Sequence, residues 1–167
     1  MPTDPHIPSV TAFFDEVTST LSYVVADMES KVCVIIDPVL ELDESSAEIT
    51  TRGADKIIEH LRVNELSCAY ILETHAHADH LSAGYFLKQR LSAPICIGQA
   101  IVDVQHVFAT MYSETPSFRR DGSQFDLLLT DGEKLALGRF SVEAIHVPGH
   151  TPACMAYRVG NAVFVGD

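Results

Sequence analysis

The sequence has little positive charge. Its 167 residues include 11 lysines and arginines against 23 aspartates and glutamates, which gives a formal net charge of −12 at pH 7 with histidine neutral. A surplus of this sign repels both the phosphates of nucleic acids and anionic lipid headgroups. We therefore expect neither a nucleic acid nor a membrane surface as a partner.

Long apolar runs and a secretory signal are also missing. The longest apolar stretches, residues 32–36 and 162–165, are far shorter than the ~20 residues that span a bilayer. The first residues, MPTDPHIPSV, contain no basic segment followed by an apolar one, as a signal peptide would. These absences predict a cytoplasmic protein.

Closely spaced cysteines are the third absence. No CxxC pair occurs, which excludes a zinc ribbon and a thioredoxin-like motif. Three of the four cysteines lie in apolar, strand-like segments, so we expect buried, reduced thiols. The four are Cys33, Cys68, Cys96 and Cys154.

Apolar residues are plentiful enough for a core. Hydrophobic residues make up 47% of the chain and charged residues 20%, values that a disordered chain does not reach. A length of 167 residues corresponds to one domain, which we place at residues 1–167. We find no internal repeat, low-complexity tract or linker in it.

Helix-like and strand-like segments alternate first, and strands alone follow. Three-to-four spacing of apolar residues predicts helices at 47–66, 81–92 and 99–110. Residues 112–121 are expected to form an exposed loop. Apolar, β-branched runs predict strands at 11–27 and 31–37, which form an antiparallel hairpin, and at 67–73, 94–97, 125–129, 133–137, 140–147, 153–159 and 162–165. This order indicates an α/β fold.

The chemistry of the chain is concentrated in residues 74–80, T-H-A-H-A-D-H. His75 and His77 are two residues apart, so both imidazoles point to the same side of an extended segment. We expect Asp79 and His80 to meet them from the start of the next helix. The motif follows a predicted strand, where α/β proteins usually bind ligands. Imidazole with carboxylate suits zinc, iron, manganese or nickel, so the residues predict a site for one metal ion or two.

Two further ligand-type residues end strand-like segments. His150 lies in a P-G-H-T turn, and Asp167 follows the apolar run F-V-G. Each alone would be interpreted as a surface or turn residue. Together with the histidine motif, they are candidate ligands. The other histidines, His6, His60 and His106, show no such pattern, and His146 is expected to have a structural role.

The order of these motifs resembles the metallo-β-lactamase superfamily, whose fold is an αββα sandwich. Within it, the segments L-E-T-H-A-H-A-D-H-L-S-A and P-G-H-T-P-A-C-M-A-Y look like the persulfide dioxygenase branch. These enzymes are relatives of glyoxalase II and oxidise glutathione persulfide. Glyoxalase II itself usually has a bulky aromatic residue where Ala78 stands, so the dioxygenase branch fits better.

The resemblance implies one Fe(II) per chain, held by His75, His150 and Asp167, which would also carry catalysis. This two-histidine, one-carboxylate face leaves positions open for O2 and a thiol persulfide, which would be converted to sulfite and the thiol. The resemblance places His77 and the Asp79-His80 pair behind these ligands. In the hydrolases of the superfamily, the same residues hold a second metal.

Two alternatives therefore stay open. One is a thioester hydrolase of the glyoxalase II type with a binuclear centre, in which zinc would replace iron. The other is a non-catalytic metal-binding or sulfide-sensing module. The family's chains continue beyond the strand that ends at Asp167, so we expect part of the second sheet layer and the thiol-binding residues to be absent from this sequence. An open sheet edge would also allow a homo-oligomer.

Overall fold

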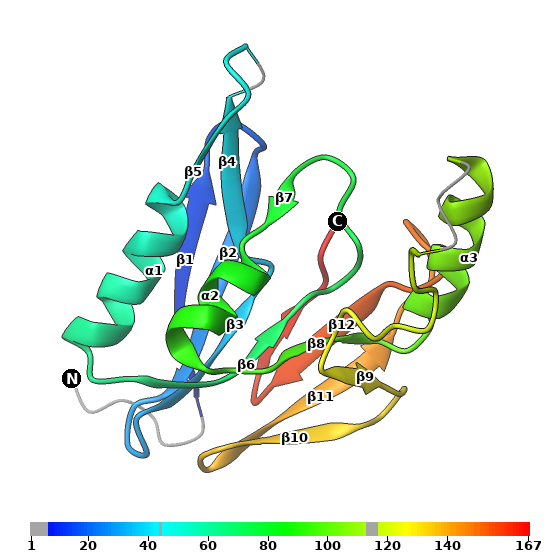
Figure 1. Ribbon diagram of the computed structural model, residues 1–167. Helices are drawn as coiled ribbons and strands as arrows, with labels where there is room; N and C mark the ends of the chain where they lie inside the picture. Colours follow the sequence, from blue (N-terminus) through cyan, green and yellow to red (C-terminus); the bar gives the residue numbers. More distant parts are fainter. Residues whose placement is uncertain (1–6, 44, 113–116) are drawn as a thin grey trace.

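The computed structural model describes residues 7–43, 45–112 and 117–167, and its first layer is a six-stranded mixed sheet (Figure 1). The strand order is β1-β2-β3-β6-β8-β9. β1, β2 and β3 pair antiparallel, whereas β3, β6, β8 and β9 run parallel. The strands are β1 (Ser9–Asp15), β2 (Thr20–Asp27), β3 (Val32–Ile36), β6 (Ser67–Leu72), β8 (Ile95–Gly98) and β9 (Leu127–Leu129).

Two smaller sheets complete the strand layers. An antiparallel four-stranded sheet packs on one face of the first sheet. A short three-stranded sheet has the strand order β5-β4-β7. The four strands are β10 (Lys134–Leu137), β11 (Phe140–His146), β12 (Met155–Val159) and β13 (Ala162–Phe164). The three are β4 (Val39–Asp43), β5 (Glu48–Thr50) and β7 (Leu81–Ser82).

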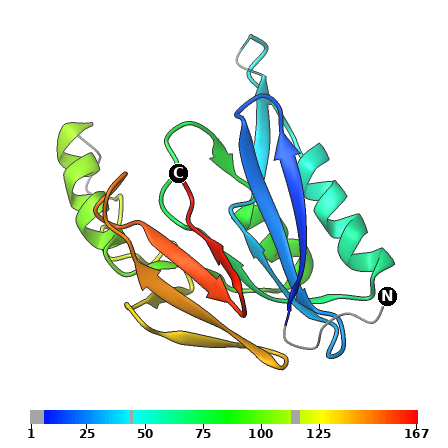
Figure 2. The same ribbon diagram turned by 180° about the vertical axis from the view of Figure 1, so that it is seen from behind.

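Two helices cover the other face of the six-stranded sheet. α1 (Arg52–Val63) and α2 (Gly84–Leu91) bury Ile57, Leu61 and Leu87 against the side chains of β2, β3 and β6. α3 (Ile101–Met111) follows β8 and lies near the connection between β11 and β12 (Figure 2). In the described part of the chain, no helix is long and apolar enough to cross a membrane.

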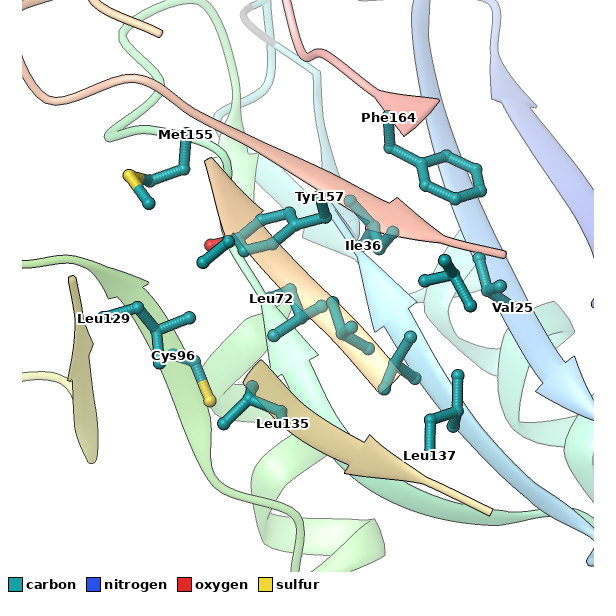
Figure 3. Close-up of a cluster of buried hydrophobic side chains, with 14 residues drawn as sticks. Val25, Ile36, Leu72, Cys96, Leu129, Leu135, Leu137, Met155, Tyr157 and Phe164 are labelled. Atoms are coloured by element: carbon teal, nitrogen blue, oxygen red, sulfur yellow. The ribbon is translucent and has the colours of Figure 1, made fainter. Parts of the chain in front are cut away.

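The main core fills the space between the two large sheets (Figure 3). Val25, Ile36 and Leu72 of the first sheet meet Tyr157 and Phe164 of the second. Tyr157 is fully buried, and its hydroxyl donates a hydrogen bond to the Glu73 carbonyl at 2.8 Å. This bond joins the second sheet to the segment that carries the histidine motif. The predicted α/β class is thus confirmed, with helix, sheet and sheet layers in succession.

The boundaries of the first predicted helix are wrong. Residues 48–50 form β5, which pairs with β4, and α1 begins only at Arg52. The reason is tertiary, because the Glu41 carboxylate of β4 accepts hydrogen bonds from the Gly53 N–H at 2.7 Å and from the Thr50 hydroxyl at 3.0 Å. These bonds hold the chain extended up to the first helical turn.

The predicted strand at 11–27 is divided in two. A tight turn separates β1 from β2, with the Asp15 carboxylate accepting from the Thr18 N–H at 2.8 Å and Ser19 at a positive φ of 58°. The predicted helix at 81–92 also begins later, at Gly84, because Leu81 pairs with Leu40 of β4. His6 and residues 113–116 of the expected 112–121 loop lie outside the described residues.

Candidate metal centre

The predicted ligands meet at one edge of the two large sheets. Asp37 follows β3, and the histidine motif follows β6, whose parallel pairing with β3 brings the ends of both strands together. The C-terminal residue, Asp167, follows β13 and lies beside the connection between β6 and β7 (Figures 1 and 2). This edge corresponds to the carboxyl ends of parallel strands, where α/β proteins bind ligands.

His75 is buried and oriented through its Nδ1 atom. The Thr74 hydroxyl donates to Asp37 Oδ2 at 2.9 Å, so its oxygen accepts the Nδ1–H of His75, also at 2.9 Å. The Nε2 atom of His75 is then left with a free lone pair, 3.8 Å from Asp167 Oδ2. Burial, helped by the neighbouring His77, lowers the pKa of His75 and favours the neutral imidazole, which is the form that binds metals.

His77 is held differently, between two buried carboxylates. Its Nε2 donates to Asp37 Oδ1 at 3.2 Å and lies 3.6 Å from Glu73 Oε2. Burial opposes protonation of His77, but the contacts with Asp37 and Glu73 outweigh it and raise the pKa of His77 to about 10. The protein therefore favours an imidazolium here, and a metal ion at Nδ1 would have to displace a proton.

Sequence reasoning missed Asp37 and Glu73, the two carboxylates around His77. Asp37 is the last residue of the predicted strand at 31–37 and precedes Pro38, a position that by itself indicates only the end of a strand. Its side chain also accepts the Thr74 N–H at 2.7 Å, and its backbone has a positive φ of 47°, which aspartate tolerates better than most residues. Burial raises the pKa of Glu73, whose Oε1 accepts from the Ser82 hydroxyl. One sequence signal for Asp37 was available: it is a carboxylate at the end of β3, the strand that runs parallel to β6, and β6 precedes the histidine motif.

Asp79 and His80 lie in an irregular segment before β7. They do not start a helix, so the expected approach from a helix start is wrong. The His80 ring stacks on His77 with centroids 4.1 Å apart, and its Nδ1 donates to the Leu81 carbonyl at 3.4 Å. Asp79 is exposed. Ligand atoms of His77, Asp79 and His80 nevertheless lie within 4.8 Å of one another.

His150 and Asp167 approach the motif from the second sheet. Ligand atoms of His75, His77 and Asp167 lie within 4.8 Å of one another. The exposed His150 ring is 4.9 Å from the His75 ring, centroid to centroid, but His150 belongs to none of the groups with that spacing in the described chain. His146 supports the turn that carries His150, since its Nε2 lies 2.8 Å from the Pro152 carbonyl.

A glycine makes the approach of Asp167 feasible. Gly166 has a positive φ of 70°, and a β-carbon there would lie 2.6 Å from the Thr74 hydroxyl oxygen. Any other residue would push the strand end away from the motif, because a contact of that length is far below van der Waals distance. The F-V-G-D sequence therefore places a carboxylate next to His75.

The donor atoms fit a transition metal. His75 Nε2, His77 Nδ1 and His80 Nε2 are buried and have no hydrogen-bond partner among the described residues. Buried polar atoms without partners are rare in native proteins. In each of these rings the other nitrogen donates to a protein oxygen, the arrangement that orients histidine ligands in metalloproteins. Nitrogen and carboxylate donors of this kind suit iron or zinc.

Residues 15–167 match the model of the metallo-beta-lactamase superfamily. The chain belongs to this superfamily. A crystal structure of ETHE1 from Myxococcus xanthus superposes with a TM-score of 0.68 at 22% identity, covering 93% of this chain and 55% of that one. This likeness confirms the fold expected from the sequence motifs.

Curated relatives of the chain carry both hydrolase and dioxygenase names. A probable metallo-hydrolase of Burkholderia pseudomallei is 45% identical over 95% of this chain and 58% of its own length. Glyoxylase B2 of Dictyostelium discoideum is 42% identical, with 90% and 52% covered. The mitochondrial persulfide dioxygenase ETHE1 of Homo sapiens is 32% identical, with 92% and 50% covered. The chain thus spans about half the length of these relatives.

Proposed function

We propose that the chain carries the metal centre of an iron-dependent persulfide dioxygenase. Its reaction would oxidise a thiol persulfide, with glutathione persulfide as the representative substrate, to sulfite by means of O2. Sequence motifs and the human persulfide dioxygenase among the relatives support this proposal. The ligands would be His75, His150 and Asp167, with one ferrous ion per chain.

The observation that carries the proposal is the environment of His77. Two buried carboxylates, Asp37 and Glu73, contact its Nε2 and raise the pKa of His77, so a proton competes with a metal ion for its Nδ1. His75 is instead kept neutral and points its free Nε2 toward Asp167. With His150 close by, the better donors amount to two imidazoles and one carboxylate, the set typical of non-haem iron oxygenases.

The residues of the chain would then have separate tasks. The Asp37–Thr74 hydrogen bonds fix the His75 ring and its tautomer. The contacts of His77 with Asp37 and Glu73 fix its ring behind the ligands. Ferrous iron, when bound, supplies adjacent positions for O2 and the persulfide sulfur.

A second candidate, a binuclear metallo-hydrolase, is favoured by a different observation. Ligand atoms of His77, Asp79 and His80 lie within 4.8 Å of one another and would form a second metal site. Two ions side by side activate a bridging water for hydrolysis. The hydrolase name of the Burkholderia pseudomallei relative agrees with this candidate.

Replacing the second group of residues distinguishes the two functions. A double variant, Asp79→Asn with His80→Gln, should keep most of the O2 consumption with glutathione persulfide if a single iron acts, and should lose thioester hydrolysis if two metals act. His75→Gln should abolish either activity. His60→Gln is the matched control, because this histidine packs on Phe13 with centroids 5.6 Å apart, on the helical face of the first sheet.

The assays are an oxygen electrode with glutathione persulfide, thioester cleavage with lactoylglutathione, and elemental analysis of anaerobically prepared protein. One iron per chain together with O2 uptake and sulfite release would support the dioxygenase. A flat oxygen trace, two zinc ions per chain and thioester cleavage would establish the hydrolase instead.

A further inference from the structure

A cavity of about 530 Å³ opens between the candidate metal centre and α3. His150 and Asp167 line it on the side of the metal centre, and Val104, Val107 and Phe108 line it from α3. Its volume lies within the range of about 300–1,000 Å³ that is usual for small-molecule sites. A substrate that fills this cavity would therefore contact both the predicted ligands and α3.

The two small residues of the histidine motif keep this route open. Ala76 and Ala78 both line the cavity and are exposed. A bulky side chain at either position would fill space next to His150. The motif thus combines metal-binding side chains with a clear passage from α3 to the metal centre.

The chemistry of the lining favours an apolar group. Val107 and Phe108 keep 56% and 44% of their surface exposed, although both are large and hydrophobic. A ligand that covered them would remove apolar surface from water, which is favourable. The charged residues of the lining are carboxylates, Asp79, Asp103 and Asp167, and neither lysine nor arginine is found in the described lining. These carboxylates would therefore repel an anionic substituent of the ligand, except where it binds the metal ion itself.

We propose that this cavity binds the organic group of an uncharged, apolar thiol or thiol persulfide, with the hydrocarbon on Val104, Val107 and Phe108 and the sulfur directed to His150 and Asp167. The persulfide part of this assignment rests on the proposed function. It refines that function, because alkyl or aryl persulfides would fit the cavity better than glutathione persulfide, which carries two carboxylates.

Thiol binding to the cobalt-substituted protein tests the cavity without relying on turnover. Benzyl mercaptan and glutathione are titrated in turn, and the thiolate-to-cobalt absorption band gives each dissociation constant. We expect benzyl mercaptan to bind about tenfold more tightly than glutathione. Phe108→Ser should weaken benzyl mercaptan about tenfold, because hydrophobic contacts of this size give roughly 10- to 200-fold discrimination, and should change glutathione binding less than twofold.

Two further variants test whether the effect of Phe108→Ser is specific to the cavity. Tyr85→Ser removes an aromatic ring that is 70% exposed on α2 and does not line the cavity, so it should leave both affinities unchanged. Val107→Thr keeps the shape of an exposed side chain and, like Phe108→Ser, should weaken the binding of benzyl mercaptan. In metal-free protein, benzyl mercaptan should also shift the methyl NMR signals of Val104 and Val107.

The outcomes separate this inference from the proposed function. Equal affinities for the two thiols, unchanged binding in Phe108→Ser, or unshifted valine methyl signals would overturn the cavity assignment. If benzyl mercaptan binds as expected while the oxygen electrode stays flat with benzyl persulfide, the cavity assignment holds and the dioxygenase proposal fails.

Discussion

Replacing Asp27 by alanine should destabilise the protein strongly, because this carboxylate joins the two large sheets. Asp27 is the last residue of β2 and is fully buried. It accepts hydrogen bonds from the Arg139 N–H at 2.8 Å and from the Arg139 guanidinium at 2.7 Å, and Arg139 lies in the turn between β10 and β11. The Ser30 hydroxyl donates a further bond at 2.9 Å.

The expected loss in the free energy of unfolding is about 2–3 kcal/mol, because the Arg139 N–H, the Arg139 guanidinium and the Ser30 hydroxyl lose a charged acceptor, and a hydrogen bond to a charged group contributes about 1.5–3 kcal/mol. Arg139→Ala should cost less, since the backbone N–H and Ser30 still satisfy the carboxylate and the guanidinium is already 40% exposed. Gly138, beside Arg139, has no room for a side chain, because a β-carbon there would lie 2.4 Å from Asp27 Oδ2. The turn is therefore built around this carboxylate.

Stability should also depend on pH in a defined direction. The contact with the Arg139 side chain is the main reason why the pKa of Asp27 lies well below its usual value. A carboxyl group with a depressed folded-state pKa contributes its full stability above the unfolded pKa of about 3.9 and loses it as the pH falls further. The difference in the free energy of unfolding between wild type and Asp27→Ala should therefore become smaller below about pH 4.

Urea unfolding at pH 7 and in acid measures both effects. The matched control is Glu143→Ala, which removes the Arg158 ion pair on the outer face of the second sheet, where Arg158 is 52% exposed. Exposed pairs contribute about 0–1 kcal/mol. The reasoning would be refuted if Asp27→Ala lowered the free energy of unfolding no more than Glu143→Ala does. It would also be refuted if the effect of Asp27→Ala were the same in acid as at pH 7.

Three further predictions concern the metal centre and its support. Gly166→Ala places a β-carbon 2.6 Å from the Thr74 hydroxyl oxygen and should weaken cobalt binding about tenfold in chelator competition; equal affinity would show that Asp167 is no ligand. Asp37→Asn should weaken cobalt about 10- to 100-fold, because it disturbs both histidine contacts, and retained affinity would contradict this. Tyr157→Phe leaves the Glu73 carbonyl without its donor and should lower the free energy of unfolding by about 1–2 kcal/mol in urea, whereas no change would disprove the bond's role.

The sequence alone determined most strands of the two large sheets and the residue types of the candidate site. Alternating apolar residues predicted the β10 to β13 segments, because each strand buries one face and the pattern is local. The T-H-A-H-A-D-H motif predicted a metal centre for the same reason: its donor residues are neighbours in the chain. His150 and Asp167 were found through their motifs, although they lie far from His75 in sequence.

Tertiary structure decided what depends on contacts between distant segments. The start of α1 depends on Glu41 in another strand, and no local pattern shows that contact. The different protonation states of His75 and His77 depend on the carboxylates of Asp37 and Glu73. These carboxylates come close to the two histidines only because β3 and β6 run parallel and end at the same edge. Burial then amplifies each charge contact, since little water is left to screen it. The candidate ligands could thus be named from the sequence, whereas their protonation and the cavity beside them depend on the folded structure.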